Sequence, residues 1–326
     1  MDSQSVLSIF DTNASSFIET ANQVFSFQVT NNPVYKQWCS LLNMQTAPIV
    51  SLQQMPYLPV SFFKTHKVTT TLFEPEYVFE SSGTTQTVNS KHLVKDISLY
   101  RQSFMQAFEL FYGNISDCCI IGLLPAYLER KGSSLVMMVD EMIKQSGHTQ
   151  SGFYLYEHEK LAATLQQLEA TGQQTLLIGV TFALLDFAEN HPMPLKHTII
   201  METGGMKGKR KEQTRNEVHD MLKKSFGLQA IHSEYGMTEL LSQAYSKGNG
   251  RFVCPPWMKV LVRDEEDPLQ VKETGRGVLN VIDLANVFSC SFLALEDVGT
   301  VYEDGSFEVH GRLDHSDIRG CSLLVL

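Results

Sequence analysis

A seven-residue stretch from Ser233 to Glu239 combines three side chains that suit a nucleotide site. Tyr235 offers a flat aromatic ring that can stack on a base, and Thr238 offers a hydroxyl that can reach a phosphate oxygen. Glu239 offers a carboxylate, a group that binds Mg²⁺ together with nucleotide phosphates. The preceding run, Leu228 to His232, has the pattern of a β-strand. The sequence therefore predicts that the ring, the hydroxyl and the carboxylate lie on one turn beyond a strand end.

A second polar stretch follows the predicted strand Tyr77 to Glu80; it reads Ser81, Ser82, Gly83, Thr84 and Thr85. Its four hydroxyls, its flexible glycine and the adjacent backbone N–H groups could cradle a polyphosphate. It is not a P-loop, because the pattern G-x-x-x-x-G-K-[ST] is absent from the sequence. An ordinary polar turn is the alternative interpretation.

The elements that would position both stretches alternate between strands and helices. Predicted strands cover Cys118 to Leu124, Thr175 to Val180 and His197 to Glu202, and helices capped by Ser, Asp and Gly residues lie between them. Such alternation predicts crossover connections and an α/β fold with mainly parallel sheets covered by helices. Ligands of open parallel sheets lie beyond the carboxyl ends of the strands, which is where both polar stretches fall.

The pattern changes after about residue 245 to short strand-like runs separated by Gly, Asp and Pro turns. These runs are Met258 to Val262, Val278 to Leu284, Ser291 to Leu295, Thr300 to Tyr302 and Ser306 to Val309. We therefore expect one core over residues 1–326. Its parts are a helical and extended segment (1–75), an α/β nucleotide-binding region (76–245), and a β-rich subdomain with the C-terminal tail (246–326).

Composition excludes several functional classes. The 326 residues are 43% hydrophobic and 19% charged, which is typical of a globular protein. A formal net charge of -10 argues against broad attraction to nucleic acid or anionic membranes. The six cysteines and ten histidines show no C-x-x-C or H-E-x-x-H spacing, so no zinc site is predicted. Without a signal sequence or a membrane-spanning apolar run, we expect a cytoplasmic protein with free thiols.

Five stretches together resemble, in order and approximate spacing, the motifs of the adenylate-forming superfamily. This superfamily includes acyl-CoA synthetases, peptide-synthetase adenylation domains and insect luciferases. The stretches are Ser81 to Thr85, Gly204-Gly205, Tyr235 to Glu239, Leu295 to Gly299 around Asp297, and Gly311 to Asp314. Within the superfamily, Leu123 to Arg130 and Ser316 to Cys321 look most like the acyl-protein synthetases (long-chain-fatty-acid–protein ligases) of bacterial luminescence fatty-acid reductase complexes. The likeness covers about residues 75–326.

The resemblance implies a binding site for ATP and Mg²⁺. Tyr235, followed by Gly236, would stack on adenine, with the Gly204-Gly205 backbone near the other side of the base. Thr238 would contact the α-phosphate, and Glu239 would bind Mg²⁺. As alternatives, Tyr235 could be a core aromatic residue and Glu239 a first-turn helix residue favoured by the helix dipole.

The resemblance also assigns the ribose and the outer phosphates. Asp297 would accept hydrogen bonds from the ribose hydroxyls, with Arg312 assisting, and Ser81 to Thr85 would hold the β- and γ-phosphates. The alternative for Asp297 and Arg312 is a surface ion pair of little energetic value.

Two departures from the superfamily affect the expected chemistry. Gln86 stands where the phosphate loop usually continues with glycine. The Gly311 to Asp314 motif usually leads into a separate C-terminal lid domain bearing a lysine that assists adenylation, and we expect that lid to be absent. Either a cation of the core then replaces the lysine, with Lys91, Lys207, Lys209 and Arg210 as candidates, or adenylation is slow or absent. The acyl-protein synthetases that the chain resembles are likewise short after this motif, which favours the first alternative.

Cys321 lies where the acyl-protein synthetases carry their acceptor cysteine, and adjacent Arg319 could lower its pKa. A small buried hydrophobic residue is the alternative. The resemblance implies ATP-dependent activation of a carboxylic acid, in the first place a fatty acid, followed by transfer to Cys321 and then to an acyl-CoA-reductase-type partner. Transfer to coenzyme A or a carrier-protein thiol, or a non-catalytic nucleotide-binding module without the lid, remain alternatives.

Overall fold

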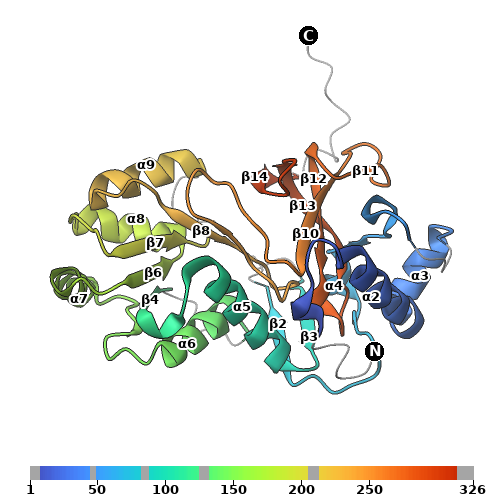
Figure 1. Cartoon of the computed structure of the whole chain (residues 1–326), viewed down its shortest axis with the longest axis horizontal. Helices are drawn as coiled ribbons and strands as arrows, with labels where there is room; N and C mark the ends of the chain where they lie inside the picture. The colour runs from blue at the N-terminus through green and yellow to red at the C-terminus, as the bar shows by residue number, and fades with distance from the viewer. Residues whose placement is uncertain (1–7, 45–48, 82–87, 125–131, 205–212, 314–326) are drawn as a thin grey trace, which may run out of the picture.

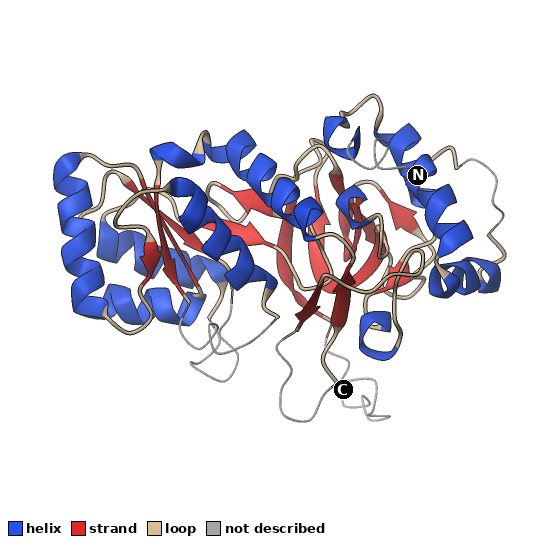
Figure 2. Ribbon diagram, turned by 90° about the horizontal axis from the view of Figure 1, so that it is seen from below, coloured by secondary structure: helices blue, strands red, loops and turns tan. Residues whose placement is uncertain are grey.

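The computed structural model describes residues 8–44, 49–81, 88–124, 132–204 and 213–313. These residues form two large sheets that lie side by side along the molecule (Figures 1 and 2). The first sheet has the strand order β5-β4-β6-β7-β8-β9, and every neighbouring pair is parallel except β8 with β9. The strands are β4 (Cys119–Leu123), β5 (Gly152–Phe153), β6 (Thr175–Gly179), β7 (Thr198–Glu202), β8 (His232–Tyr235) and β9 (Ala244–Ser246).

Helices cover both faces of this first sheet. Figure 1 shows α8 (Thr181–Asn190) and α9 (Arg215–Phe226) on one side and α5 (Ile97–Tyr112) and α6 (Ser134–Ser146) on the other, with α7 (His158–Thr171) at the far end. Local signals fix the helix ends. Asp96 caps α5 by accepting a hydrogen bond from the Ser98 N–H, and α6 and α9 end at glycines in the left-handed region, Gly147 and Gly227.

The second sheet is mostly antiparallel and joins distant parts of the chain. It contains β1 (Leu58–Pro59), β13 (Phe292–Val301), β12 (Gly275–Asp283), β10 (Met258–Arg263) and β11 (Val271–Lys272), with β14 (Phe307–Arg312) paired to β13. β1 runs parallel to β13, so a segment near the N-terminus completes a sheet built from the C-terminal third. The adjacent helices are α2 (Phe17–Asn31), α3 (Pro33–Leu41) and α4 (Phe62–Thr65), and Gln28 of α2 donates to the Asn286 carbonyl at 3.0 Å.

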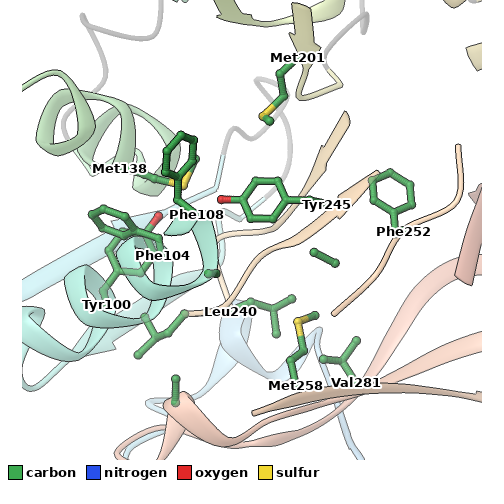
Figure 3. Packing of buried hydrophobic residues seen from close by; sticks show 14 of the residues in the cluster. Tyr100, Phe104, Phe108, Met138, Met201, Leu240, Tyr245, Phe252, Met258 and Val281 are labelled. Atoms are coloured by element: carbon green, nitrogen blue, oxygen red, sulfur yellow. The ribbon is translucent and has the colours of Figure 1, made fainter. Parts of the chain in front are cut away.

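A separate hairpin of β2 (Tyr77–Glu80) and β3 (Lys91–Val94) carries the predicted phosphate loop between its strands. Short 3₁₀ helices complete the described elements; they are Ser8–Asp11, Leu52–Gln54, Ile115–Asp117 and Leu284–Asn286. Figure 3 shows part of the buried core, where side chains of α5 and α6 lie near residues from β7, β9 and the second sheet. Among the described residues, no helix is long and apolar enough to cross a membrane.

The predicted α/β fold with mainly parallel strands is confirmed, but two strand predictions were wrong. The strand placed at Leu228 to His232 lies instead at His232–Tyr235, because Leu228 follows the cap residue of α9 and its N–H still donates back to the Lys223 carbonyl. The runs Ser291 to Leu295 and Thr300 to Tyr302 belong to one strand, β13. No turn separates the two runs, and Asp297 lies buried within the strand with its carboxylate hydrogen-bonded.

Candidate active site

The edge between the two sheets brings together three of the motif residues, Tyr235, Asp297 and Arg312. The Tyr235 hydroxyl of β8 donates to Asp297 Oδ2 at 2.6 Å, and Arg312 Nε of β14 donates to Asp297 Oδ1 at 3.0 Å. Asp297 and Arg312 are direct register partners on β13 and β14. Asp297 is only 6% exposed, whereas the Arg312 side chain is 55% exposed, so the pair joins a buried carboxylate to a guanidinium at the surface.

Tyr235 is the last residue of β8 and not part of a turn, so its predicted local conformation was wrong. Its half-buried ring packs against Phe252 and Phe307, with ring centroids 5.7 and 5.3 Å apart. Burial, reinforced by the Asp297 carboxylate, raises the pKa of the phenol well above its usual range. The hydroxyl is therefore a proton donor at neutral pH, as its bond to Asp297 requires.

Thr238 and Glu239 form a turn between β8 and β9, so the alternative of a first helical turn for Glu239 is wrong. The turn is anchored from two sides: His92 Nδ1 lies 2.9 Å from the Thr238 carbonyl oxygen, and Asn286 Nδ2 donates to the Glu239 carbonyl at 2.6 Å. Burial lowers the pKa of His92 to about 4, so the ring is neutral. Since a carbonyl only accepts, Nδ1 carries the proton.

The same contacts place the stems of the Ser81 to Thr85 stretch beside this turn. Ser81 and Ser90 exchange hydrogen bonds at the base of the loop, with the Ser90 N–H donating to Ser81 Oγ at 2.9 Å. His92 lies two residues beyond Ser90 on β3, and Ser90 also hydrogen-bonds the Glu239 carboxyl. Ser82, Gly83, Thr84 and Thr85 lie outside the described residues.

Glu202, at the end of β7, collects hydrogen bonds from three elements. Thr181 Oγ1 and the Gly204 N–H each donate to Oε2 at 2.9 Å, and Ser233 Oγ donates to Oε1 at 3.1 Å. Two residues of α9 also face this carboxylate: Arg215 Nε lies 3.5 Å and His219 Nε2 3.7 Å from Oε1. Glu202 therefore connects the Gly204 segment to β8, next to Tyr235.

Electrostatics keep Glu202 ionised despite its burial. Desolvation of the buried carboxylate opposes ionisation, but the interaction with His219 and the Arg215 charge, together with the donors above, outweigh it and lower the pKa of Glu202 to about 2. Gly204 has a φ of +75°, which favours glycine, and its carbonyl accepts from the Thr181 N–H at 2.9 Å. Gly205 lies outside the described residues.

A scan against known protein families found no matching family model. The chain is 22% identical over 324 residues to a long-chain-fatty-acid–luciferin-component ligase of Vibrio harveyi, covering 92% of this chain and 84% of the relative. Among solved structures, a 2-hydroxyisobutyryl-CoA ligase in complex with 2-HIB-AMP and CoA matches with a TM-score of 0.67 and 12% identity, over 93% of this chain and 72% of that one.

The ATP-bound MatB of Rhodopseudomonas palustris matches with a TM-score of 0.54 and 17% identity, over 72% of this chain and 47% of that chain. The chain thus spans about half the length of MatB. It has the fold of the adenylate-forming acyl ligases. The resemblance inferred from the motifs is thereby confirmed, and the adenylate-forming fold accounts for both sheets.

Within this adenylate-forming fold, several polar residues near the motifs were missed by the sequence reasoning. Arg215 and His219 converge on the Glu202 carboxylate, and His92 hydrogen-bonds the Thr238 carbonyl. The available signal was the position of Glu202 at a strand end, two residues before Gly204. Nothing in the sequence marks His92 or His219, because their partners lie 146 residues away and on another element.

The remaining predicted site residues are placed as follows. Gly236 is exposed at the end of β8. Lys91, a candidate for the lid lysine, has a side chain 61% exposed and lies 3.5 Å from Glu80. Lys207, Lys209, Arg210 and Cys321 lie outside the described residues. Lys64 of α4 is a further cation whose charge acts on Glu239.

Proposed function

We propose that this chain activates a carboxylic acid with ATP, forming an acyl-adenylate and pyrophosphate, and then transfers the acyl group to a thiol. The observation that carries the proposal is the meeting of Tyr235, Asp297 and Arg312, which come from three strands and lie beside the Thr238-Glu239 turn. Motifs separated by up to 77 positions in the sequence gather at one edge, as a shared ligand requires. The adenylate-forming fold and the ATP-bound MatB support ATP as that ligand.

The residues at this edge suit the chemistry of adenylation. A carboxylate oxygen attacks the α-phosphorus, the bond to the β-phosphate oxygen breaks, and pyrophosphate leaves; the protein positions the reactants and neutralises charge. Tyr235 would stack on adenine beside Gly204-Gly205, and Gly236 would let the ligand approach the turn. Asp297, held by Arg312, would receive the ribose hydroxyls. Thr238 would contact the α-phosphate, and Ser81 to Thr85 the outer phosphates.

Glu239 fits the role of Mg²⁺ ligand. Burial raises the pKa of this carboxyl, and the Ser90 hydrogen bond with the charges of Arg312 and Lys64 opposes the shift without reversing it. Neighbouring positive charge does not fully offset the burial of this carboxylate, so a bound cation would stabilise its ionised form strongly. Bound Mg²⁺ would neutralise phosphate charge there, and it would favour the ionised form of Glu239.

For the second step we propose Cys321 as acceptor: its sulfur attacks the acyl carbon, AMP leaves, and a thioester remains. Among the described residues, burial raises the pKa of all five cysteines, to about 12 for Cys39 and Cys118, so none of them is a ready thiolate. A fatty acid is the first candidate substrate, because the Vibrio harveyi relative is named for one. A protein of the acyl-CoA-reductase type is the proposed next acceptor.

ATP–pyrophosphate exchange across a panel of carboxylic acids tests the first step. Asp297→Asn should raise the KM for ATP about tenfold, which corresponds to about 1.4 kcal/mol. Asp304→Asn is the matched control, because Asp304 lies on the same β13–β14 hairpin and contacts only Arg251 and Ser306 among the described residues. No exchange with any acid would favour the non-catalytic nucleotide-binding module.

Labelling with radioactive acid and ATP tests the second step. We expect a hydroxylamine-labile label on the protein that is lost in Cys321→Ser and retained in Cys118→Ser. A label that persists in Cys321→Ser would exclude this acceptor. Exchange without any protein label would favour transfer to coenzyme A or a carrier-protein thiol.

A further inference from the structure

Three polar side chains lie on or directly beside the β8–β9 pair. Glu234 and Tyr245 are direct register partners on these antiparallel strands, so their side chains point to the same side. Gln243 immediately precedes β9, two residues before Tyr245. A Cβ built on Gly236 would lie 2.4 Å from Glu234 Oε1 and 3.4 Å from Gln243 Cγ, so both side chains meet beside Gly236. Glu234, Gln243 and Tyr245 are called the β8–β9 polar cluster below.

Two atoms of this polar cluster are buried without a hydrogen-bond partner in the described part of the chain. They are Gln243 Oε1 and the Tyr245 hydroxyl, and the two residues are 3% and 2% exposed. Leaving such groups unpaired is costly, and the large majority of buried polar atoms in proteins are bonded. Two unpaired buried atoms, on residues two positions apart in the sequence, therefore indicate a missing hydrogen-bonding partner beside the β8–β9 pair.

The surroundings of the polar cluster are aromatic and apolar. The Tyr245 ring contacts Phe111 and Tyr112 of α5, with centroids 5.3 and 5.4 Å apart. In Figure 3 the Tyr245 hydroxyl points toward Phe108 and Met138, which supply no hydrogen bond. A ligand at this place would thus combine an apolar body with a polar group.

The polar cluster reaches the surface at Gly236, which is exposed, while Glu234 is half-buried. Gly236 lies between Tyr235 and Thr238, the proposed adenine and α-phosphate contacts. The acyl carbon of an adenylate is bonded through oxygen to that α-phosphorus, so the first carbons of the acid lie nearby. The polar group that completes the cluster would therefore be close to the carboxyl end of the acid.

The geometry points to an acid substrate that carries a hydrogen-bond-donating substituent, a hydroxyl or an amino group, near its carboxyl end and held by Glu234, Gln243 and Tyr245. This inference rests on the proposed function and narrows its substrate class. Gln243 Oε1 accepts only, and the Tyr245 hydroxyl both donates and accepts, so the set matches a group with at least one donor hydrogen. Burial, with the nearby Glu202 charge, raises the pKa of Glu234 to about 8, so this carboxyl is mostly neutral at pH 7.

ATP–pyrophosphate exchange with acids of equal chain length tests the inference. The probes are octanoate, 3-hydroxyoctanoate and 3-aminooctanoate, with their 2-substituted isomers. We expect kcat/KM for at least one substituted acid to exceed that for octanoate about tenfold or more, because a site built to bond a substituent rejects the analogue without it. The preferred acid identifies the hydroxyl or the amino group.

Tyr245→Phe and Gln243→Met should reduce that preference at least severalfold while exchange with octanoate persists. Tyr112→Phe is the matched control, because this neighbouring tyrosine already bonds His232 at 3.2 Å. Tyr245→Phe should not lower the unfolding midpoint, since it removes an unpaired buried hydroxyl; this readout separates binding from misfolding. If the wild type prefers octanoate to every substituted acid, this inference is wrong and the proposed function stands. The same holds if Tyr245→Phe and Gln243→Met both leave the selectivity unchanged. Absence of exchange with any acid would overturn the proposed function and this inference with it.

Discussion

Glu202 and Glu234 lie on neighbouring strands of one sheet, yet their environments are opposite. Glu202 receives three hydrogen bonds and faces Arg215 and His219, so its pKa falls to about 2 although it is buried. Burial and the Glu202 charge raise the pKa of Glu234 to about 8. The comparison teaches that partners, and not depth alone, decide whether a buried carboxyl is ionised.

The two carboxyls also face different parts of the candidate site. Glu202 bonds the Gly204 N–H and the Ser233 hydroxyl, and so it fixes two segments that flank the proposed adenine position. Glu234 lies beside Gly236, toward the proposed acyl position. An ionised, fully bonded group is suited to hold backbone in place, whereas a neutral group can still bond a ligand.

The largest effect is expected for Glu202→Gln. The substitution removes the negative charge that Arg215 and His219 face and leaves the partly buried Arg215 (28% exposed) without this anionic partner, so we expect a cost near the lower end of the range for buried pairs, about 3 kcal/mol. We expect that loss in the free energy of unfolding at pH 7, measured by urea denaturation with an unchanged m-value. Asp140→Asn, which removes an exposed carboxylate paired with Lys144, should cost less than about 1 kcal/mol.

The pH dependence gives the sign of the Glu202 contribution. Its pKa in the folded protein lies below the ordinary value of 4.5, so its stabilisation is complete above pH 4.5 and disappears as the pH falls toward 2. Glu202→Gln should flatten the stability profile in this acid window. An equally steep acid limb in the variant would show that other carboxylates cause it.

Glu234→Gln should have a smaller effect of opposite sign. The raised pKa means that the folded protein gains stability from the protonated carboxyl below pH 4.5 and loses it as the pH rises through about 8. Glutamine mimics the neutral form, so the variant should match the wild type near pH 4 and exceed it by about 1–3 kcal/mol at pH 9. Unfolding free energies between pH 4 and pH 9 measure this; parallel profiles would contradict the assignment.

Local signals explain why the helices and most strands could be predicted. The Asp96 cap and the glycines Gly113 and Gly147 act within one turn of their helices, so the bounds of α5 and α6 follow from neighbouring residues. The error at Leu228 is instructive, because apolar residues after a C-terminal glycine often pack back on the helix that they end. A pattern of apolar residues alone cannot distinguish a segment that packs back on the preceding helix from a β-strand.

The candidate site was only partly predictable for a related reason. Tyr235, Thr238, Glu239 and Asp297 were found because their motif is ordered along the chain. The contact between Tyr235 and Asp297 spans 62 residues, and that between His92 and Thr238 spans 146. Such contacts depend on how the two sheets pack against each other, and a local sequence pattern does not predict that packing. Glu202 and Glu234 are both single acids on strands in the sequence, and only their partners distinguish them.

Ser233→Ala should test the Glu202 network at the level of one hydrogen bond. The hydroxyl donates to Glu202 Oε1 at 3.1 Å and is fully buried. Its removal leaves the carboxylate with its other donors, so we expect a loss of about 1 kcal/mol, well below that of Glu202→Gln. A double-mutant cycle with Glu202→Gln should show coupling of similar size, whereas additive losses would place the two residues in separate networks.

The smallest effect is expected at the Lys91–Glu80 pair on the β2–β3 hairpin. Lys91 Nζ lies 3.5 Å from Glu80 Oε1, which is also the distance between Arg215 Nε and Glu202 Oε1. The Lys91 and Glu80 side chains, however, are 61% and 40% exposed. Water screens the exposed pair, so Lys91→Gln should change the free energy of unfolding by less than about 0.5 kcal/mol. If the two pairs differ in their contribution to stability at the same distance, the difference in burial, and hence in desolvation, determines how much each pair contributes. If ATP–pyrophosphate exchange collapses in Lys91→Gln while stability is kept, Lys91 instead acts on the substrate, in the role of the lid lysine.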